Sequence, residues 1–237
     1  MELCKENNID WNTISKTRHI DSWGKSQERQ LRMENIASLI PFYINKQKRQ
    51  FTIDDIKKQV KENVVSILDK YKPDPKLMET YALKIKSISP NKIITTNYDD
   101  FIENILGKDC IVITKGKSYD ASHRKIELIK IHGSKDNVEK LVFFEEEYFK
   151  FNNDGHYFYN KVYTILHENT VLFLGYSLTD PNIRHILFEL KLKDEEPNNA
   201  RKIILLKEEI DSYSKDFFEN VYGVEVVDEV GIETVFG

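Results

Sequence analysis

The chain has 237 residues, of which 40% are hydrophobic and 31% are charged, and its formal net charge is −4. With 35 basic against 39 acidic residues, no overall charge favours nucleic acid or a membrane surface as a partner. No apolar run reaches the roughly 20 residues that a membrane-spanning helix needs, and the first residues lack the apolar core of a secretory signal. The two cysteines, Cys4 and Cys110, cannot form a zinc site by themselves. We therefore expect a cytoplasmic globular protein that binds no metal.

The first 90 residues predict mostly helices. Residues 1–24 offer few elements, and we expect Trp11, Ile14 and Trp23 to be core anchors. Residues 25–90 predict a helical insert of three amphipathic helices with no strand between them. In the first of these helices, Pro41 is expected to kink the helix or shorten it.

The second and third helices of this insert carry signals for their first residues. Thr52 and Asp55 match a capping box, and Asp74 followed by Pro75 is typical of a helix start. Pro90 is expected to end the third helix. The apolar stripes of the three helices are interpreted as core: Ile36, Leu39, Ile40, Tyr43 and Ile44; then Ile53, Ile56, Val60, Val64, Ile67 and Leu68; then Leu77, Tyr81 and Ile85.

From residue 91 onward, strands and helices alternate. The apolar runs at 171–174 and 202–206 are typical of parallel strands that are covered on both faces. A helix pattern between them completes a strand–helix–strand unit. We therefore predict an α/β fold: a Rossmann-like, doubly wound and mostly parallel sheet with a helical insert at 25–90, in a single domain over 1–237. The predicted strands are 92–95, 110–114, 126–131, 140–143, 170–174, 201–206 and 224–227.

Polar residues cluster just after the first of these strands. In open parallel sheets, ligands lie beyond the carboxyl ends of the strands. Thr95, Thr96, Asn97 and Asp99 therefore fall where a ligand would bind. The structural alternative is that Asp99 or Asp100 caps the following helix and that Asn97 shapes the turn. This segment alone leaves both interpretations open.

Two later strand ends carry groups of similar kind. His132 leaves a strand and can act as an acid or a base near neutral pH, since its ordinary pKa is about 6.5. The alternative is a hydrogen-bonded structural histidine. Gly175 allows close approach of backbone to a ligand, and Ser177 offers a hydroxyl near a helix start, which suits phosphate or ribose oxygens. Taken singly, this third segment is an ordinary strand–turn–helix joint that Asp180 caps.

Together and in this order, the three segments resemble the sirtuin-like (SIR2-like) family. The matching pieces are TTNYD at 95–99, KIHGS at 130–134 and LGYSLTDPN at 174–182. The resemblance covers residues 91–190, with weaker agreement to the end of the chain. It is nearest to the SIR2-like domains of bacterial anti-phage defence systems, which consume NAD.

The resemblance implies roles for individual residues. Asn97 would lie beside the nicotinamide ribose and position the attacking water, Asp99 would border the nicotinamide pocket, and His132 would act at the ribose as catalytic base. Gly175 and Ser177 would contact the adenosine half of NAD and its phosphates. These residue types suit the cleavage of an N-glycosidic bond, because the cation-like ribosyl centre needs fixed polar groups and a base, and no metal. The expected NAD-binding set is completed by Thr95, Thr96 and Tyr176.

Three departures from the family pattern bear on the function. The Gly-rich GAGxS-type phosphate loop is absent, and no two glycines are two residues apart. We therefore expect either that this loop lies upstream of Met1 or that the chain is a degenerate binder. Thr96 stands where the family's deacetylases have a glutamine, and two cysteines cannot form their four-cysteine zinc module. The last two departures favour hydrolysis of NAD over deacylation of a protein.

The predicted function is therefore that of an NAD+ glycohydrolase (NADase), which takes NAD as its substrate and releases nicotinamide and ADP-ribose in bacterial anti-phage defence. Two alternatives stay open: an NAD-dependent protein deacylase, and a non-catalytic nucleotide-sensing or assembly module. The resemblance further implies a homo-oligomer with a defence-system partner protein or a fused domain. The helices within 25–90 are the expected contact surface, and neither nucleic acid nor a membrane is expected as a partner.

Overall fold

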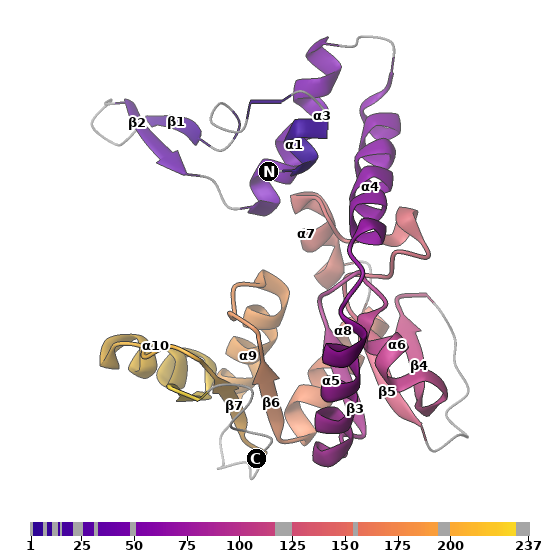
Figure 1. Cartoon of the computed structure of the whole chain (residues 1–237). Helices are drawn as coiled ribbons and strands as arrows, with labels where there is room; N and C mark the ends of the chain where they lie inside the picture. Colours follow the sequence, from indigo (N-terminus) through magenta and orange to yellow (C-terminus); the bar gives the residue numbers. More distant parts are fainter. Residues whose placement is uncertain are drawn as a thin grey trace. The chain divides into compact units, whose positions relative to one another are not determined.

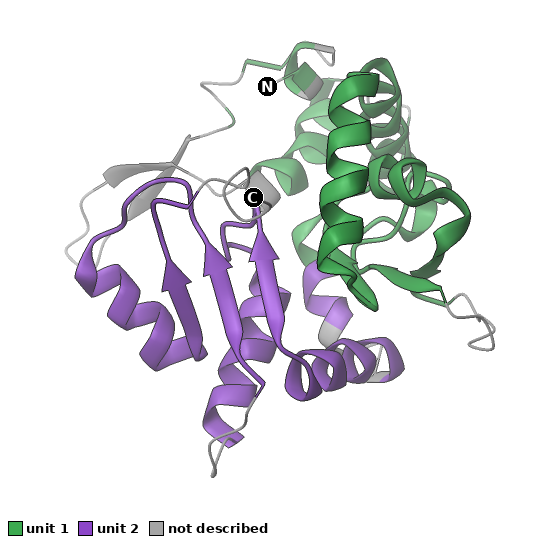
Figure 2. Cartoon of the chain, turned by 60° about the horizontal axis from the view of Figure 1, so that its bottom comes forward, with its two compact units in different colours: residues 1–147 green, residues 148–237 purple. Residues whose placement is uncertain are grey.

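The chain divides into two compact units, Met1–Glu147 and Tyr148–Gly237, which are coloured separately in Figure 2. Figure 1 labels the helices and strands along the chain. Of the predicted core anchors, Ile14 is buried, while Trp11 and Trp23 lie outside the described residues. That the units form one domain stays a prediction. The computed structural model describes residues 2–6, 9–10, 14, 16–20, 26–30, 33–47, 51–116, 125–153, 156–193 and 200–230.

The first unit begins with a short helix and a hairpin. The helix α1 spans Glu2–Glu6, and β1 (Lys16–Ile20) pairs antiparallel with β2 (Ser26–Gln30). The prediction of helix from residue 25 onward is therefore wrong for β2. These two segments are polar and show no alternation of apolar residues, which is the pattern that reveals a half-buried strand. Backbone pairing between β1 and β2 defines the hairpin. Such pairing cannot be recognised from the residues of one strand.

Three helices follow, as predicted, and two of them have the predicted caps. The Thr52 side chain accepts from the backbone N of Asp55, and the Asp55 side chain accepts from the backbone N of Thr52, so the capping box is confirmed. The Asp74 side chain accepts from the backbone N of Lys76, with Pro75 at the first helical position. The helices are α3 (Met33–Gln47), α4 (Ile53–Lys70) and α5 (Pro75–Ile88).

Pro41 lies inside α3, which continues to Gln47, so the alternative that this proline shortens the helix is wrong and the alternative of a kink stays a prediction. An internal proline costs a helix about 3 kcal/mol. Burial of a large aliphatic side chain contributes about 1.5–3 kcal/mol, and α3 buries Ile36, Ile40 and Ile44. Packing of this face therefore offsets the proline. These side chains share one core cluster with Cys4, Ile9, Ile14, Ile56, Val60 and Phe144.

The third helical stripe packs less completely than predicted. No residue of α5 is fully buried, and Leu77 is 48% exposed. The interpretation of Leu77 as core is therefore wrong for this unit. Tyr81 does make a tertiary contact, because its ring packs edge-on against the ring of Phe101 at 6.0 Å.

The parallel sheet of the first unit has the strand order β3-β5-β4. The helix α6 (Phe101–Leu106) follows β3, and β5 lies between β3 and β4. In the central strand, Leu128 and Ile129 are fully buried, as expected for a parallel strand covered on both faces. The strand bounds are Lys92–Thr95 for β3, Cys110–Thr114 for β4 and Ile126–Lys130 for β5.

The predicted strand at 140–143 is wrong. A short 3-10 helix, η2, occupies Val138–Lys140, and residues 141–143 form no strand. The backbone groups here have scattered partners rather than a neighbouring strand: Val142 N donates to His132 O, and Phe143 N donates to the Glu147 carboxylate. The apolar run reflects burial of Leu141 instead.

The second unit is built from strands that alternate with helices. Its strands β6, β7 and β8 lie side by side in that order and are parallel (Figure 2). The helices α9 and α10 connect them, which confirms the predicted α/β class with parallel sheets of the Rossmann-like kind. Among the described residues, no helix is long and apolar enough to cross a membrane. The bounds are α7 Glu145–Asn153, α8 His156–Glu168, β6 Val171–Leu174, α9 Pro181–Lys193, β7 Lys202–Leu205, α10 Ser212–Tyr222 and β8 Val224–Val227.

Candidate active site

Two of the predicted catalytic residues follow the carboxyl ends of neighbouring strands. The last residue of β3, Thr95, is opposite the last residue of β5, Lys130. The ladder continues for one more bond, because Ile131 N donates to Thr95 O at 3.1 Å. Asn97 and His132 each lie two positions beyond these strand ends. The register therefore brings the two backbone positions to the same edge of the sheet, as the sequence predicts.

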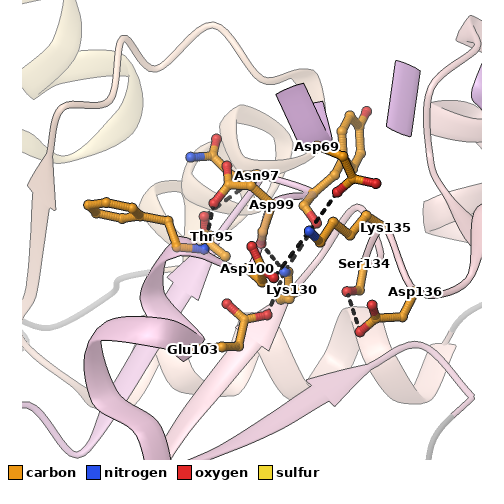
Figure 3. A network of polar contacts seen from close by, with 12 residues as sticks. Asp69, Thr95, Asn97, Asp99, Asp100, Glu103, Lys130, Ser134, Lys135 and Asp136 are labelled. Carbon is orange, nitrogen blue, oxygen red and sulfur yellow. Dashed lines mark hydrogen bonds and ion pairs between the residues drawn. The ribbon is translucent and has the colours of Figure 1, made fainter. Parts of the chain in front are cut away.

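The loop after β3 has an internal hydrogen-bond pattern that fixes its turn. Asn97 N donates to Thr95 Oγ1 at 3.1 Å, and Phe101 N donates to Asp99 Oδ1 at 3.0 Å. Asp99 thus accepts from the first amide of α6, while Asp100 is the N-cap residue and makes no side-chain cap bond. The place of Asp99 at the nicotinamide stays a prediction. Asn97 itself is exposed, while Thr96 is half-buried. Figure 3 shows the side chains of this loop.

His132 is held in a tight and buried turn. Only 4% of this residue is exposed, and its carbonyl accepts from Val142 N at 2.9 Å. Gly133 has φ +88, and a Cβ at this position would lie 2.8 Å from the backbone oxygen of Lys140. Only glycine fits such a backbone without displacement. Gly133 therefore sets the position of the histidine beside it.

Tyr98 connects the loop after β3 with the turn after β5 through Val142. Its hydroxyl donates to Val142 O at 2.6 Å, and Val142 N donates to the carbonyl of His132. One peptide segment thus connects the neighbour of Asn97 to His132. Tyr98 lies within the TTNYD motif, but its partner could not be predicted from the sequence, since the bond spans 44 positions.

A charged cluster connects the loop after β3 with the helix α4 through Lys135. Lys135 Nζ lies 2.8 Å from Asp69 Oδ1 of α4 and 3.1 Å from Asp100 Oδ2 (Figure 3). The hydrogen bonds to Asp69 and Asp100 raise the pKa of Lys135 above its usual value. For Asp100, burial by itself would raise the pKa, but the hydrogen bond from Lys135 and neighbouring donors lower it below the usual range. The loop that bears Asn97 is therefore held at more than one point.

The third predicted segment lies in the second unit, after β6. Gly175 has φ +59, and the space where its Cβ would lie is open. The Tyr176 ring stacks on Phe173 with centroids 5.7 Å apart. Burial raises the pKa of the Tyr176 phenol, and the nearby Asp180 adds to this effect. Ser177 Oγ lies 2.9 Å from the Thr179 hydroxyl. Gly175, Tyr176 and Ser177 belong to a different unit from Asn97 and His132, so their joint action on NAD stays a prediction.

The helix that follows this segment has the predicted cap. Asp180 Oδ1 accepts from the backbone N of Asn182 at 2.9 Å and from that of Ile183 at 3.0 Å. Leu178 has a left-handed backbone with φ +52 and is buried. Such strain persists only where the surroundings determine it, and here the burial of the leucine side chain does so.

The three motif segments fall within one family match. A family model described as a SIR2-like domain matches residues 91–227. The chain belongs to this SIR2-like family. The match begins just before β3 and therefore leaves the helices α3, α4 and α5 outside it.

Similar proteins of this family carry names that point to NAD and to defence. The chain is 30% identical over 141 residues to "Defense-associated sirtuin 2" of Bacillus subtilis, covering 57% of this chain and 12% of that protein. It is 26% identical over 162 residues to "NAD(+) hydrolase ThsA" of Enterococcus faecium, covering 65% of this chain and 34% of that protein. A ThsA of Cytobacillus dafuensis is 26% identical over 163 residues, covering 67% and 31%. The chain thus spans about a third or less of the length of these relatives.

The described titratable groups near the two loops are engaged with other protein groups. Among the described residues, no group of three or more His, Cys, Asp or Glu side chains could hold a metal ion. The polar groups around Asn97 are instead engaged with lysine ammonium groups and backbone amides. At this edge of the sheet, the described carboxylates of Asp99 and Asp100 therefore accept hydrogen bonds from protein groups.

Proposed function

We propose that this SIR2-like chain is the catalytic part of an NAD+ glycohydrolase that releases nicotinamide and ADP-ribose in bacterial anti-phage defence. The observation that supports the proposal is the register of β3 and β5, in which Thr95 and Lys130, each two residues before Asn97 and His132, are paired. The similar proteins named NAD(+) hydrolase and defence-associated sirtuin support it. Because the chain spans only part of those proteins, the activity is proposed for the full-length protein.

In the proposed reaction, the bond between the ribose C1′ and the nicotinamide nitrogen breaks, and its electron pair leaves with nicotinamide. A water oxygen then bonds to C1′, and His132 takes the proton of that water as general base. The Asn97 amide orients the water and the ribose. Fixed polar groups of this kind stabilise a cationic ribosyl centre because they need no reorganisation during the reaction.

The remaining residues of the site are assigned to NAD binding. Asp99 borders the nicotinamide pocket, and Thr95 and Thr96 line the same loop. In the second unit, Gly175 and Ser177 contact the adenosine half and its phosphates; the open space at the Gly175 Cβ position supports this assignment, because backbone can approach a ligand there. Tyr176 completes the set.

We further propose that the full-length protein works as a homo-oligomer with a partner protein or a fused domain. The relatives are about three to eight times longer than the segment that they share with this chain, so further domains are expected in them. The helices α3, α4 and α5 are the proposed contact surface. Light scattering after size exclusion tests this proposal, and a monomer at micromolar concentration would contradict it.

The decisive experiment incubates the full-length protein with NAD and follows nicotinamide and ADP-ribose, with and without candidate activators. Release of nicotinamide without any acylated peptide supports the hydrolase. Release that requires an acyl-lysine peptide would instead identify a deacylase. Binding of NAD without turnover under any activating condition would identify a nucleotide-sensing module and contradict the proposed function.

A further inference from the structure

The last residue of the central strand β5 is a lysine that is completely buried. Lys130 is 0% exposed, and it ends a strand whose preceding residues, Leu128 and Ile129, are apolar and buried. A lysine is almost never fully buried unless its charge is paired. This position therefore holds an ammonium group where packing alone would favour an aliphatic side chain.

The ammonium group of Lys130 has three protons, and the structure shows three acceptors for them. Lys130 Nζ donates to Tyr98 O at 3.2 Å, to Asp99 O, and to Glu103 Oε1 at 2.6 Å. Two of these acceptors are backbone carbonyls of the residues that directly follow Asn97. Figure 3 shows the Lys130 amine beneath this loop, with Glu103 of α6 on its other side.

These contacts differ from those that a lysine would need for catalysis. Because Lys130 is fully buried and all three protons are donated within the protein, it has no group left to touch a substrate. The contacts instead hold the backbone of the loop after β3, at the carbonyls of Tyr98 and Asp99. After the paired residues the ladder adds one bond, from Ile131 N to Thr95 O, and one further backbone bond, from Lys135 N to Tyr98 O at 3.0 Å, reaches the loop. The position of Asn97 therefore also depends on side-chain ties.

We propose that Lys130 is a positioning residue that fixes the loop bearing Asn97 to the strand leading into His132. The lysine sits two residues before His132 and holds the two carbonyls after Asn97, so it determines the separation of the two groups. The catalytic part of this proposal rests on the proposed NAD hydrolysis. The mechanical part, which is the tie between strand and loop, does not.

The test compares Lys130→Met with Lys202→Met in the full-length protein. Lys202 is a matched control, because it is also a buried lysine in the central strand of a three-stranded parallel sheet, and its Nζ donates to the backbone oxygen of Ala200. A misplacement of about 1 Å can cost about 10²-fold in rate. We expect kcat per folded molecule to fall about 10²-fold in Lys130→Met and to be unchanged in Lys202→Met.

Two further readouts separate positioning from a merely structural role. In an Asn97→Ala background, Lys130→Met should lower kcat little further, because residues that act as a unit are not additive. Hydrogen exchange of the Asn97 and Phe101 amides, which donate to Thr95 and Asp99, should accelerate in Lys130→Met and not in Lys202→Met. If Lys130→Met fails to fold, Lys130→Met/Glu103→Met removes both charges and leaves no unpaired buried charge, and the same losses are expected.

The outcomes decide the two proposals separately. If the wild-type protein releases no nicotinamide, the proposed function fails, and the exchange rates still decide whether Lys130 holds the loop. Wild-type exchange at Asn97 and Phe101 in the Lys130→Met protein would overturn the tie. A Lys130→Met protein that melts at a lower temperature but keeps the wild-type kcat would show a structural lysine and would overturn the positioning role.

Discussion

The loop after β3 and the turn after β6 are stabilised in different ways. The loop after β3 is held by residues that are distant in sequence: Tyr98 donates to Val142 O across 44 positions, and Lys130 donates to Tyr98 O across 32. The turn after β6 is shaped by near neighbours, since Ser177 contacts Thr179 and the Asp180 side chain accepts from the amide of Asn182. We infer that the first loop depends on the packing of its whole unit, whereas the second turn is set largely by its own residues.

The largest expected effect comes from the two residues assigned to the reacting atoms. His132→Ala should lower the rate of nicotinamide release by about 10²–10⁴-fold, because loss of a general base typically has this effect. Asn97→Ala should remove the positioning of water and ribose, and the double variant should be little worse than either single variant. Rates and melting temperatures are measured on the same preparations.

Burial of His132 makes the stability readout informative. Asn97 is exposed, so Asn97→Ala should leave the melting temperature unchanged, while His132→Ala removes a buried side chain and should lower it modestly. A destabilised His132→Ala protein with full activity per folded molecule would remove this histidine from the site. It would also weaken the assignment of Asn97 to the same site.

A pair of glycine substitutions compares the turn after β5, which contains Gly133, with the turn after β6, which contains Gly175. Both Gly133 and Gly175 have a left-handed backbone, but a Cβ would lie 2.8 Å from the backbone oxygen of Lys140 at Gly133 and would meet open space at Gly175. Gly175→Ala should cost only the local strain, about 1–2 kcal/mol. Gly133→Ala should cost more than this and should also lower the activity, because the backbone next to His132 must shift. Urea unfolding and rate measurements test both; equal losses of stability would contradict the comparison.

Tyr98→Phe should have a smaller effect, because it removes one hydroxyl and keeps the ring. Loss of the bond to Val142 O should lower the free energy of unfolding by about 0.5–1.5 kcal/mol and should lower the activity, since the link between the two loops is lost. Tyr71→Phe is the control, because the Tyr71 hydroxyl bonds to Glu2 at an exposed site. If the two variants have the same stability and activity, the link through Val142 has no functional role.

The smallest expected effect concerns the pH dependence of the Lys135 cluster. The pKa of Asp100 is lowered in the folded protein, so its ionised form contributes stability at neutral pH. This contribution is lost as the pH falls below the ordinary carboxyl pKa of about 3.9 and through the lower folded value. Because the Asp100 side chain is 44% exposed, Asp100→Asn should cost less than about 1 kcal/mol at pH 7. The melting temperatures of variant and wild type should converge toward acid; a difference that grows there would contradict the assignment.

The sequence alone determined those features that depend on near neighbours. The strands at 92–95, 110–114 and 224–227 have the predicted bounds, because each is a short segment rich in β-branched residues, which favour strands. The caps at Thr52 and Asp74 were readable for the same reason, since each bond spans two or three residues. The order of the three motif segments likewise sufficed to predict the SIR2-like family that the family match shows.

Tertiary structure decided the features whose partners are distant in sequence. The apolar run at 140–143 is not a strand, because its backbone groups bond to loops and to a glutamate rather than to a neighbouring strand. The insertion of β5 between β3 and β4 brings Lys130 beneath the Asn97 loop. A lysine in a strand is ordinarily a solvated side chain, and only the approach of two carbonyls and a carboxylate from other segments makes its burial favourable.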